Sequence, residues 1–388
     1  MARLLDLTRL VSRLGRGPMT GVDRVEFAYL TRLLAGETPL FALVRTRLGF
    51  VLLDRAGAQG VADRAAGQAL GKVDWIGRLI WRGDALRARA EADVRRLAAG
   101  RATRLGLGRL LRHLPVGFVY YNVGHANLAA RVMRAVKAAG GKVAVLVHDT
   151  IPLDHPEFTR PGIAQVFARK MAVVSGFADL VIHTTRDARG KTEGHLARMG
   201  RCPAGLVSRL GVGVTPPDVR PEGLAARYFV ALGTIEPRKN HALLLEVWAR
   251  GKGLPKLYIV GTKGWAEPGL FARIAATPGV EVLSGLTDGA VTALLAGAEA
   301  LLWPSFAEGF GLPPLEAAAL GVPVIASDLS VTRELMGDYP VYLDATDAYS
   351  WLETITALGQ RPGPRRERAG QIDLPTWDDH FNLVFNFG

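Results

Sequence analysis

The sequence has a single cysteine, Cys202, and no apolar run long enough to cross a membrane. A lone thiol excludes a disulfide framework and a cysteine-based metal site, and it favours a reducing compartment. A spanning helix would need about 18 uninterrupted apolar residues. The first residues, MARLLDLTRLVSRLGR, carry charges throughout their apolar run, which fits a first strand better than a signal peptide. We therefore expect a cytoplasmic protein, with peripheral contact to the inner face of the membrane as an open alternative.

Positive charge is in clear excess, and it is unevenly placed along the chain. A formal charge of +12 and a pI near 10.1 indicate an anionic partner: nucleic acid, a membrane surface or a phosphorylated substrate. Between residues 57 and 114, twelve Lys and Arg residues stand against five Asp and Glu residues. More than half of the whole excess therefore lies in this basic strip.

The basic strip, residues 57–114, also carries large apolar side chains between Trp75 and Trp81. One interpretation is a basic helical insertion whose Trp and Ile/Leu face binds an anionic membrane. The other is a solvated basic helix that packs on its own domain through its aromatic side. No nucleic-acid recognition module is found in the strip, so nucleic acid is not an expected partner.

Outside the basic strip, apolar strand patterns alternate with helix patterns at the spacing of parallel α/β sheets. A chain of 388 residues suits two domains, and the Gly/Pro-rich stretch that ends near residue 223 is the best linker. We expect an N-terminal domain at 1–222 and a C-terminal domain at 223–375. A last helix at about 376–388 is expected to pack back on the first domain.

The expected strands can be placed from their apolar runs. In the first domain they lie at 3–8, twice within 39–54, and at 117–124, 142–148, 178–185 and from 205 onward. In the second they lie near 228–235, 256–261, 280–285, 299–304, 323–327 and 340–344. A polar loop is expected between the first strand and a helix that begins at Thr20-Gly21. Pro152 and Pro156 predict another loop over 150–158.

The stretch LLWPSFAEGFGLPPLEAAALGVPVIASD, residues 301–328, predicts a strand, a glycine turn, a short helix and a second strand. Gly309 and Gly311 let the backbone turn sharply and expose its N–H groups, which makes the following helix N-terminus an anion site. Glu308 and Glu316 bracket the turn with seven residues between them. Carboxylates beside an anion site suit the hydroxyls of a sugar joined to a phosphate.

The segment YFVALGTIEPRKN, residues 228–240, places cations at the end of another strand. Gly233 and Thr234 end the strand, and Arg238 and Lys239 stand just before a helix that begins near Asn240. Two cations and helix-terminal N–H groups at this edge of a sheet would suit a diphosphate. The alternative on these residues alone is a solvated Arg–Lys pair.

Two features of the first domain carry a weaker signal. Gly21 opens a helix after a strand and a loop, as nucleotide-binding domains begin, although a plain helix cap explains it equally well. His148 falls at the carboxyl end of its strand, where open α/β sheets bind ligands. A lone histidine there is about as often a structural residue, and its place at the mouth of the sheet favours function.

Together these motifs resemble the retaining glycosyltransferases of family 4. The resemblance rests on FVALGTIEPRKN, IVGTKGW, SGLTD and the stretch around the two glutamates, and it covers most of residues 228–345. Thinner matches at TGVDRV, residues 20–25, and HDTIPLDHPEF, residues 148–158, are similar to bacterial mannosyl- and rhamnosyl-type transferases of surface-polysaccharide assembly. The basic strip matches no known pattern.

The resemblance implies an α/β fold of type B, in which two Rossmann-like parallel-sheet domains hold a nucleotide sugar in the cleft between them. It implies that Glu308 holds hydroxyls of the donor sugar and that Glu316 holds the ribose. Arg238 and Lys239 would bind the diphosphate, and His148 would approach the sugar from the opposite domain. The other implied donor-binding residues are Gly21, Gly233, Thr234, Gly309, Phe310, Gly311 and Leu312. A single glycine in TGVD, where many members carry two, is a departure that weakens the phosphate role of Gly21.

The expected reaction is retaining, metal-independent transfer of a hexose from a nucleotide sugar, with GDP-mannose favoured. No Asp-x-Asp triplet occurs in the chain, so the usual acidic clamp for a metal is missing and no cofactor is expected. The expected acceptor is a saccharide or lipid-linked saccharide of exopolysaccharide, lipopolysaccharide or capsule assembly. A UDP-sugar transferase of the same fold, an epimerase or phosphorylase, and a non-enzymatic basic membrane-binding protein are the alternatives.

Overall fold

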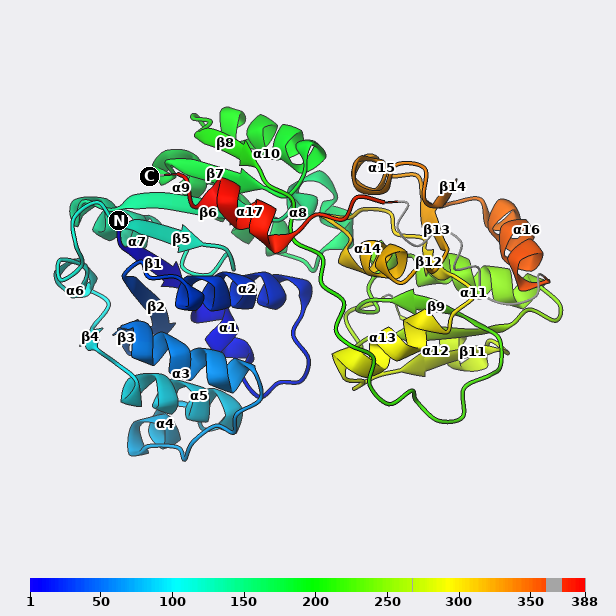
Figure 1. Cartoon of the computed structure of the whole chain (residues 1–388), viewed down its shortest axis with the longest axis horizontal. Helices are drawn as coiled ribbons and strands as arrows, with labels where there is room; N and C mark the ends of the chain where they lie inside the picture. Colours follow the sequence, from blue (N-terminus) through cyan, green and yellow to red (C-terminus); the bar gives the residue numbers. More distant parts are fainter. Residues whose placement is uncertain (267, 361–371, 388) are drawn as a thin grey trace.

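The computed structural model describes residues 1–266, 268–360 and 372–387. These residues form two α/β units, each built on its own sheet, which lie side by side (Figure 1). The chain passes from the first unit to the second through the segment 208–227, which contains no helix or strand.

The first unit is built on an eight-stranded sheet with the order β4-β3-β2-β1-β5-β6-β7-β8. The neighbouring strands in the part β2-β1-β5-β6-β7-β8 are parallel to each other. The β2–β3 and β3–β4 pairs at the other edge are antiparallel. The strands are β1 Arg3–Asp6, β2 Leu40–Thr46, β3 Gly49–Leu53, β4 Gly100–Ala102, β5 Val119–Asn122, β6 Lys142–Val147, β7 Leu180–His183 and β8 Ala204–Val207.

The second unit is built on a six-stranded parallel sheet with the order β11-β10-β9-β12-β13-β14. The strand order reverses between β9 and β12, and open sheets of this type bind ligands beyond the carboxyl ends of the strands at such a point. The strands are β9 Tyr228–Leu232, β10 Lys256–Val260, β11 Val280–Leu283, β12 Leu301–Trp303, β13 Val324–Ser327 and β14 Val341–Leu343.

Helices cover both faces of each sheet, as parallel sheets require. Those of the first unit are α1 Thr8–Arg13, α2 Gly21–Ala35, α3 Arg55–Ala65, α4 Trp75–Ile80, α5 Ala85–Arg96, α6 Leu107–Leu111, α7 Ala130–Ala138, α8 Ile151–Asp154, the 3-10 turn η1 Pro156–Phe158, α9 Ile163–Phe177 and α10 Arg186–Arg198. Those of the second are η2 Pro237–Lys239, α11 His241–Arg250, α12 Leu270–Ala276, α13 Asp288–Ala296, α14 Leu312–Ala319, α15 Ser330–Met336 and α16 Ala348–Gly359.

The uninterrupted apolar strands explain why both faces are covered. Leu4 and Leu5 of β1 are fully buried, although they point to opposite faces and belong to different hydrophobic clusters. In the second unit, Leu301 and Leu302 of β12 divide between two clusters in the same way. Alternate residues of a strand face opposite sides of a sheet, so such runs need apolar partners on each side.

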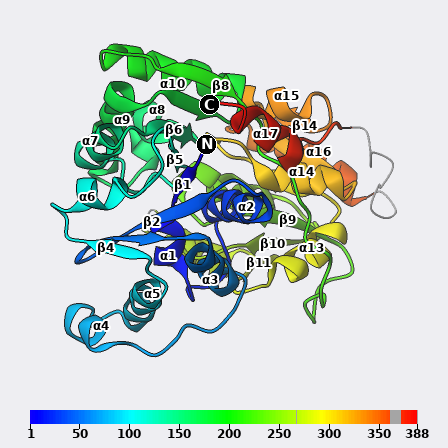
Figure 2. The ribbon, with the colours of Figure 1, turned by 60° about the vertical axis from the view of Figure 1, so that its left-hand side comes forward.

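The C-terminal helix α17, Trp377–Val384, packs on the first unit after the chain has completed the second. His380 is buried where α17 meets the first unit. Its Nε2 lies 2.7 Å from the Tyr29 hydroxyl, and its Nδ1 lies 2.9 Å from the Ser208 hydroxyl. The Arg3 guanidinium lies 3.8 Å from the ring centroid of Phe385. The two chain ends therefore lie close together on the first unit, as both views show (Figures 1 and 2).

The prediction of a loop over residues 150–158 is wrong, because these residues form α8 and η1. Both prolines fall in the first turn of a helical segment, where a missing N–H leaves no bond unmade. The hydroxyl of Thr150, which precedes α8, also donates to Asp154 Oδ2 at 2.6 Å. Likewise, α1 occupies part of the polar loop expected after the first strand.

The basic strip is not one basic helix, which corrects the expectation from sequence. It contains most of α3, then α4, α5 and α6, together with the edge strand β4. Its charges are partly neutralised internally, because α5 buries two acids, Glu91 and Asp93, that pair with arginines. The pairs include Arg87 with Glu91 at 3.2 Å and Arg64 with Asp93 at 2.5 Å.

The helix α4 keeps the amphipathic surface that the strip predicted. Trp75 is 74% exposed and Leu79 is 58% exposed. Arg78 and Arg82 are exposed beside them, and neither has an ion pair among the described residues. Both views place α4 at the lower edge of the first unit, beside α5 (Figures 1 and 2).

Candidate active site

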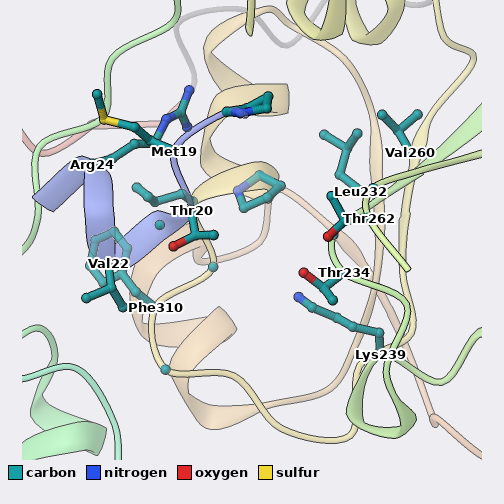
Figure 3. Close-up of a pocket in the computed structure, with 18 of the residues that line it drawn as sticks. Met19, Thr20, Val22, Arg24, Leu232, Thr234, Lys239, Val260, Thr262 and Phe310 are labelled. Atoms are coloured by element: carbon teal, nitrogen blue, oxygen red, sulfur yellow. The ribbon is translucent and has the colours of Figure 1, made fainter. Parts of the chain in front are cut away.

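A cavity of about 780 Å³ lies between the two units, at the carboxyl ends of their parallel strands. In Figure 3, Thr20 and Arg24 at the start of α2 face Thr234 and Lys239, which follow β9, across this cleft. All the site residues predicted from the sequence line the same cleft: Gly21, His148, Gly233, Thr234, Arg238, Lys239, Glu308, Gly309, Phe310, Gly311, Leu312 and Glu316. The structure thus brings the predicted residues together, and their individual roles remain predictions.

Glu308 is held by the two cations that the sequence placed beside a diphosphate. Arg238 donates to its Oε2 at 2.6 Å, and Lys239 donates to its Oε1 at 2.7 Å. The Glu308 side chain is only 6% exposed. Burial alone would raise the pKa of this carboxyl, but the Arg238 and Lys239 cations outweigh burial and hold the pKa below its usual value. Glu308 is therefore ionised at neutral pH and serves as a hydrogen-bond acceptor.

Arg238 is fixed from several directions by the loop that carries Glu308. Its guanidinium also donates to the Ala307 carbonyl at 2.7 Å and to Glu236 Oε1 at 2.7 Å. Its own carbonyl accepts from the Phe306 N–H at 2.9 Å. Hydrogen bonds therefore join the turn after β9 to the turn after β12, and both turns line the cleft.

Lys239 lies between a carboxylate and an aromatic ring. Its Nζ is 3.6 Å from the centroid of Trp303, the last residue of β12. Gly233 makes room for the stem, since a Cβ there would stand 3.1 Å from Lys239 Cε, and its φ of +133° also favours glycine. Burial lowers the pKa of Lys239 to about 8. A cation with this pKa can gain and lose its proton close to neutral pH.

The glycine turn before α14 is shaped by two different requirements. Gly311 has a φ of +89° and caps the helix, which then begins at Leu312 with prolines in its first turn. Gly309 is needed because a Cβ there would stand 2.8 Å from Asp149 Oδ2, across the cleft. The sequence predicted both glycines, but it gave no signal for the contact with Asp149.

Asp149 is a cleft residue that sequence reasoning did not include in the site. Burial raises the pKa of its carboxyl, although Arg238 opposes this effect. Its Oδ1 accepts from the Ile151 N–H at 3.1 Å, so the carboxyl is fixed by the first turn of α8. Its position next to His148 in the sequence was the available signal.

His148 is buried at the end of β6 and faces the cleft. Its Nε2 donates to the Val123 carbonyl at 2.7 Å, which fixes the tautomer and the ring orientation. Burial lowers the pKa of His148 to about 4, so the ring is neutral at pH 7. A neutral imidazole can orient a sugar hydroxyl but adds no charge to the site.

Gly21 is the first residue of α2, and no atom lies within 4 Å of the position that a Cβ would take there. The helix start is set by a capping box, in which the Thr20 N–H donates to Asp23 Oδ2 at 2.9 Å. Thr20 therefore caps α2, as one of the two interpretations of this segment expected. The space beside Gly21 is open and could hold a ligand.

Glu316 is paired with a residue that the sequence did not reveal. Arg24 of α2 donates from its NH1 to Glu316 Oε1 at 2.7 Å, across the cleft. Its NH2 lies 3.4 Å from Asp288 Oδ2 at the start of α13. Burial raises the pKa of Glu316, and Arg24 opposes that rise.

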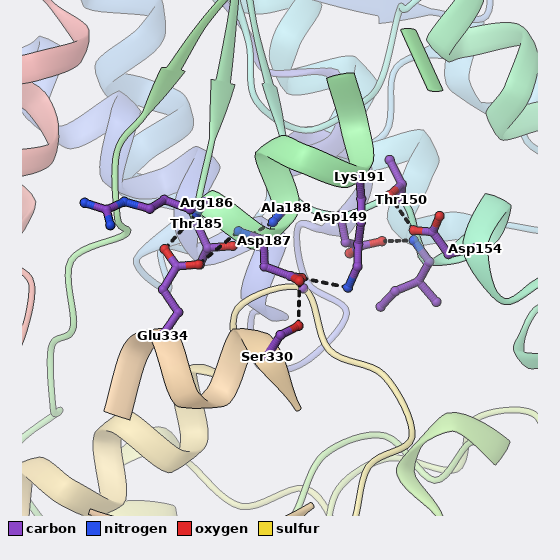
Figure 4. A network of polar contacts seen from close by, with 12 residues as sticks. Asp149, Thr150, Asp154, Thr185, Arg186, Asp187, Ala188, Lys191, Ser330 and Glu334 are labelled. Carbon is purple, nitrogen blue, oxygen red and sulfur yellow. Dashed lines mark hydrogen bonds and ion pairs between the residues drawn. The ribbon is translucent and has the colours of Figure 1, made fainter. Parts of the chain in front are cut away.

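A second polar contact joins the two units, between α15 and the start of α10. Glu334 of α15 accepts from the backbone N–H groups of Arg186 and Asp187 at 2.7 and 2.9 Å, which are the first residues of α10. The Ser330 hydroxyl donates to Asp187 Oδ1 at 2.5 Å. Figure 4 shows Glu334 and Ser330 pointing at this helix end from below. A carboxylate at a helix N-terminus is electrostatically favoured.

Within the three described ranges, no cluster of His, Cys, Asp and Glu is arranged to hold a metal ion. Among the helices of those ranges, none combines the length and the apolar character that a membrane span requires.

Comparison with known proteins finds a family match in the second half of the chain. Residues 226–360 match the family described as "Glycosyl transferases group 1". The chain is 30% identical over 278 residues to the "Serotype-specific mannosyltransferase WbdA" of Escherichia coli, across 64% of this chain and 34% of WbdA. It is 27% identical over 224 residues to the "O-antigen chain mannosyltransferase RfbU" of Salmonella typhimurium, across 56% of this chain and 61% of RfbU. The chain thus spans about a third of the length of WbdA and three fifths of RfbU.

The fold has a full-length counterpart among solved structures. The structure of Anabaena HepE in complex with UDP-glucose matches with a TM-score of 0.66 and 14% identity, over 100% of this chain and 99% of HepE. At this identity the likeness concerns the fold alone. It confirms the predicted class of two Rossmann-like domains, here with an additional antiparallel edge, and the group 1 match confirms the resemblance seen in the sequence. Residues 226–360, which make up most of the second unit, are therefore similar to the Glycosyl transferases group 1 family.

Proposed function

We propose that the chain is a retaining, metal-independent glycosyltransferase that moves a hexose from a nucleotide sugar to a glycan acceptor. The observation that carries the proposal is Glu308, a buried and ionised carboxylate held by Arg238 at 2.6 Å and Lys239 at 2.7 Å in a cleft between two Rossmann-like sheets. The group 1 match and the mannosyltransferase relatives support the reaction class.

In the proposed reaction, the acceptor hydroxyl attacks the anomeric carbon of the donor while the bond from that carbon to the phosphate oxygen breaks. The proton of the hydroxyl passes to the leaving phosphate, so no enzymic nucleophile is required. Arg238 and Lys239 offset the negative charge that grows on the nucleoside diphosphate. Glu308 accepts hydrogen bonds from donor-sugar hydroxyls and acts as a positioning group, because a carboxylate with a lowered pKa is a poor base.

The favoured donor is GDP-mannose, and UDP-sugars are the alternative. WbdA and RfbU are both named as mannosyltransferases, which supports mannose as the transferred sugar. HepE was solved with UDP-glucose, which keeps the uridine nucleotide in consideration. Metal independence is proposed on the absence of Asp-x-Asp from the sequence, and activity that persists in a chelator is its test.

A thermal-shift screen against GDP-, UDP-, ADP- and dTDP-sugars is the experiment for the proposed function. A bound donor raises the unfolding midpoint by mass action, and we expect the largest rise with GDP-mannose. A larger rise with a UDP-sugar would replace the donor and keep the reaction class. If no nucleotide sugar raised the midpoint and none were turned over, a non-enzymatic basic binding protein would become the better account.

The proposed acceptor is a saccharide or a lipid-linked saccharide at the inner face of the cytoplasmic membrane. RfbU is named as an O-antigen chain mannosyltransferase, which supports an acceptor from surface-polysaccharide assembly. The exposed Trp75 and Leu79 of α4, beside Arg78 and Arg82, support contact with an anionic membrane. The enzyme would then meet a lipid-linked acceptor where that acceptor is anchored.

A further inference from the structure

Arg24 places a cation of the first unit between two carboxylates of the second. It is the fourth residue of α2, and its side chain is 31% exposed at the edge of the cleft. Its NH1 is 2.7 Å from Glu316 Oε1, and its NH2 is 3.4 Å from Asp288 Oδ2. Figure 3 shows Arg24 beside Met19 and Thr20 on the α2 side of the pocket.

The contact with Arg24 changes what Glu316 can do. The Glu316 side chain is 16% exposed, and burial favours its neutral form. A neutral carboxyl would present a hydroxyl and lose part of its capacity to accept hydrogen bonds. The Arg24 guanidinium opposes this by favouring the charged form. It also fixes the orientation of the carboxylate through Oε1, whereas no described residue donates to Oε2.

The geometry points to Arg24 as a positioning residue that holds the Glu316 carboxylate through Oε1, so that the carboxylate can bind the two ribose hydroxyls of the donor nucleotide. This inference rests on the proposed function, because it takes Glu316 as the ribose-binding group. A carboxylate offers about four acceptor positions, so Glu316 can keep Arg24 and still accept from a ribose. Since Arg24 and Glu316 belong to different units, the ribose site is complete only when the cleft is closed.

The test compares ribonucleotides with their 2′-deoxy counterparts. We would measure dissociation constants of GDP, UDP, 2′-deoxy-GDP and 2′-deoxy-UDP by calorimetry, for the parent chain and for Arg24→Gln. Because a hydrogen bond to a charged group is weakened, we expect Arg24→Gln to bind the ribonucleotide about tenfold more weakly than the parent chain does. The loss for the 2′-deoxy nucleotide should be clearly smaller, because one of the bonds that Glu316 makes is already missing.

Two further variants separate positioning from folding. Arg32→Gln removes another cation of α2, which pairs with Asp378 at the surface 2.9 Å away, and it should leave every constant unchanged. In a Glu316→Gln background, Arg24→Gln should add little, since both variants disable the same carboxylate. Arg24→Lys should restore part of the discrimination against the 2′-deoxy nucleotide because it keeps the charge.

The acidity of Glu316 gives a readout that a structural role would not move. Without Arg24 the pKa of Glu316 is expected to rise. When the pH is lowered, Arg24→Gln should therefore lose ribonucleotide binding at a higher pH than the parent chain does. Equal losses for ribo- and deoxynucleotides would show a direct phosphate contact and overturn the inference, as would unchanged constants. If the parent bound neither GDP nor UDP, the proposed function itself would fail, which is a different result.

Discussion

The Lys239 ammonium lies 3.6 Å from the centroid of the Trp303 ring, at the point where β12 ends and the glycine turn begins. Trp303 is 2% exposed, so the cation meets an aromatic face in a dry environment, where such contacts are strongest. The same ammonium donates to Glu308 at 2.7 Å. One buried lysine thus connects the end of the strand to the carboxylate proposed to hold the sugar.

The pKa of Lys239, lowered by burial to about 8, predicts a pH dependence. The protonated form predominates below that pH and is the form that attracts a diphosphate. We therefore expect kcat/KM for the donor to fall as the pH rises through about 8. Lys239→Arg keeps its charge at all these pH values, so its profile should lack this alkaline decline. A parent profile that stayed flat well above this pH would contradict the assignment.

Glu334→Gln should weaken closure of the cleft. The variant replaces a carboxylate that accepts from two backbone N–H groups of α10 at 2.7 and 2.9 Å. Because charge-assisted bonds of this kind are weakened, we expect the donor KM to rise about fivefold and kcat to change less. Small-angle scattering of the unliganded variant should report a larger radius of gyration. Glu246→Gln on α11, whose partner Arg250 lies on the same helix, is the matched control and should leave both values unchanged.

Trp75→Ser combined with Leu79→Ser should reduce binding to vesicles of phosphatidylglycerol and phosphatidylcholine. Removing each apolar side chain from a membrane interface should lower the affinity for vesicles about tenfold, because its apolar area is no longer buried in the membrane. Vesicle sedimentation measures the effect, and transfer to a water-soluble acceptor should remain normal. Leu105→Ser provides the control, since Leu105 is 88% exposed but lies outside α4. Equal vesicle binding by the parent and the double variant would exclude α4 as the membrane contact.

Much of the fold could be predicted because parallel strands leave a strong apolar signal. The strands β9 to β14 all fall where the sequence placed them, and each is followed by the helix that its connection requires. The errors share a cause. In α8 and η1, prolines that usually indicate a loop occupy first-turn positions, so composition alone misled the assignment. The basic strip misled through its net charge, which does not reveal that Glu91 and Asp93 are buried partners.

The residues of the candidate site also differ in whether the sequence could reveal them. Glu308, Arg238 and Lys239 could be predicted because each stands at the end of a recognisable strand, within a short motif. Arg24 could not, because its partner Glu316 is 292 residues away and the contact depends on how the two units meet. Asp149 was missed for the same reason, since its neighbour Gly309 comes from the opposite side of the cleft.

The most direct measurement for the central claim is single-turnover transfer by Glu308→Ala, together with its affinity for the nucleoside diphosphate product. Removing the carboxylate that holds the donor sugar should lower the rate by about a thousandfold or more, in the range seen when a transition-state contact is lost. The product should still bind, because Arg238 and Lys239 remain. Glu281→Gln, at an exposed ion pair with Lys256, should behave as the parent. Near-normal transfer by Glu308→Ala would contradict the assignment of the site.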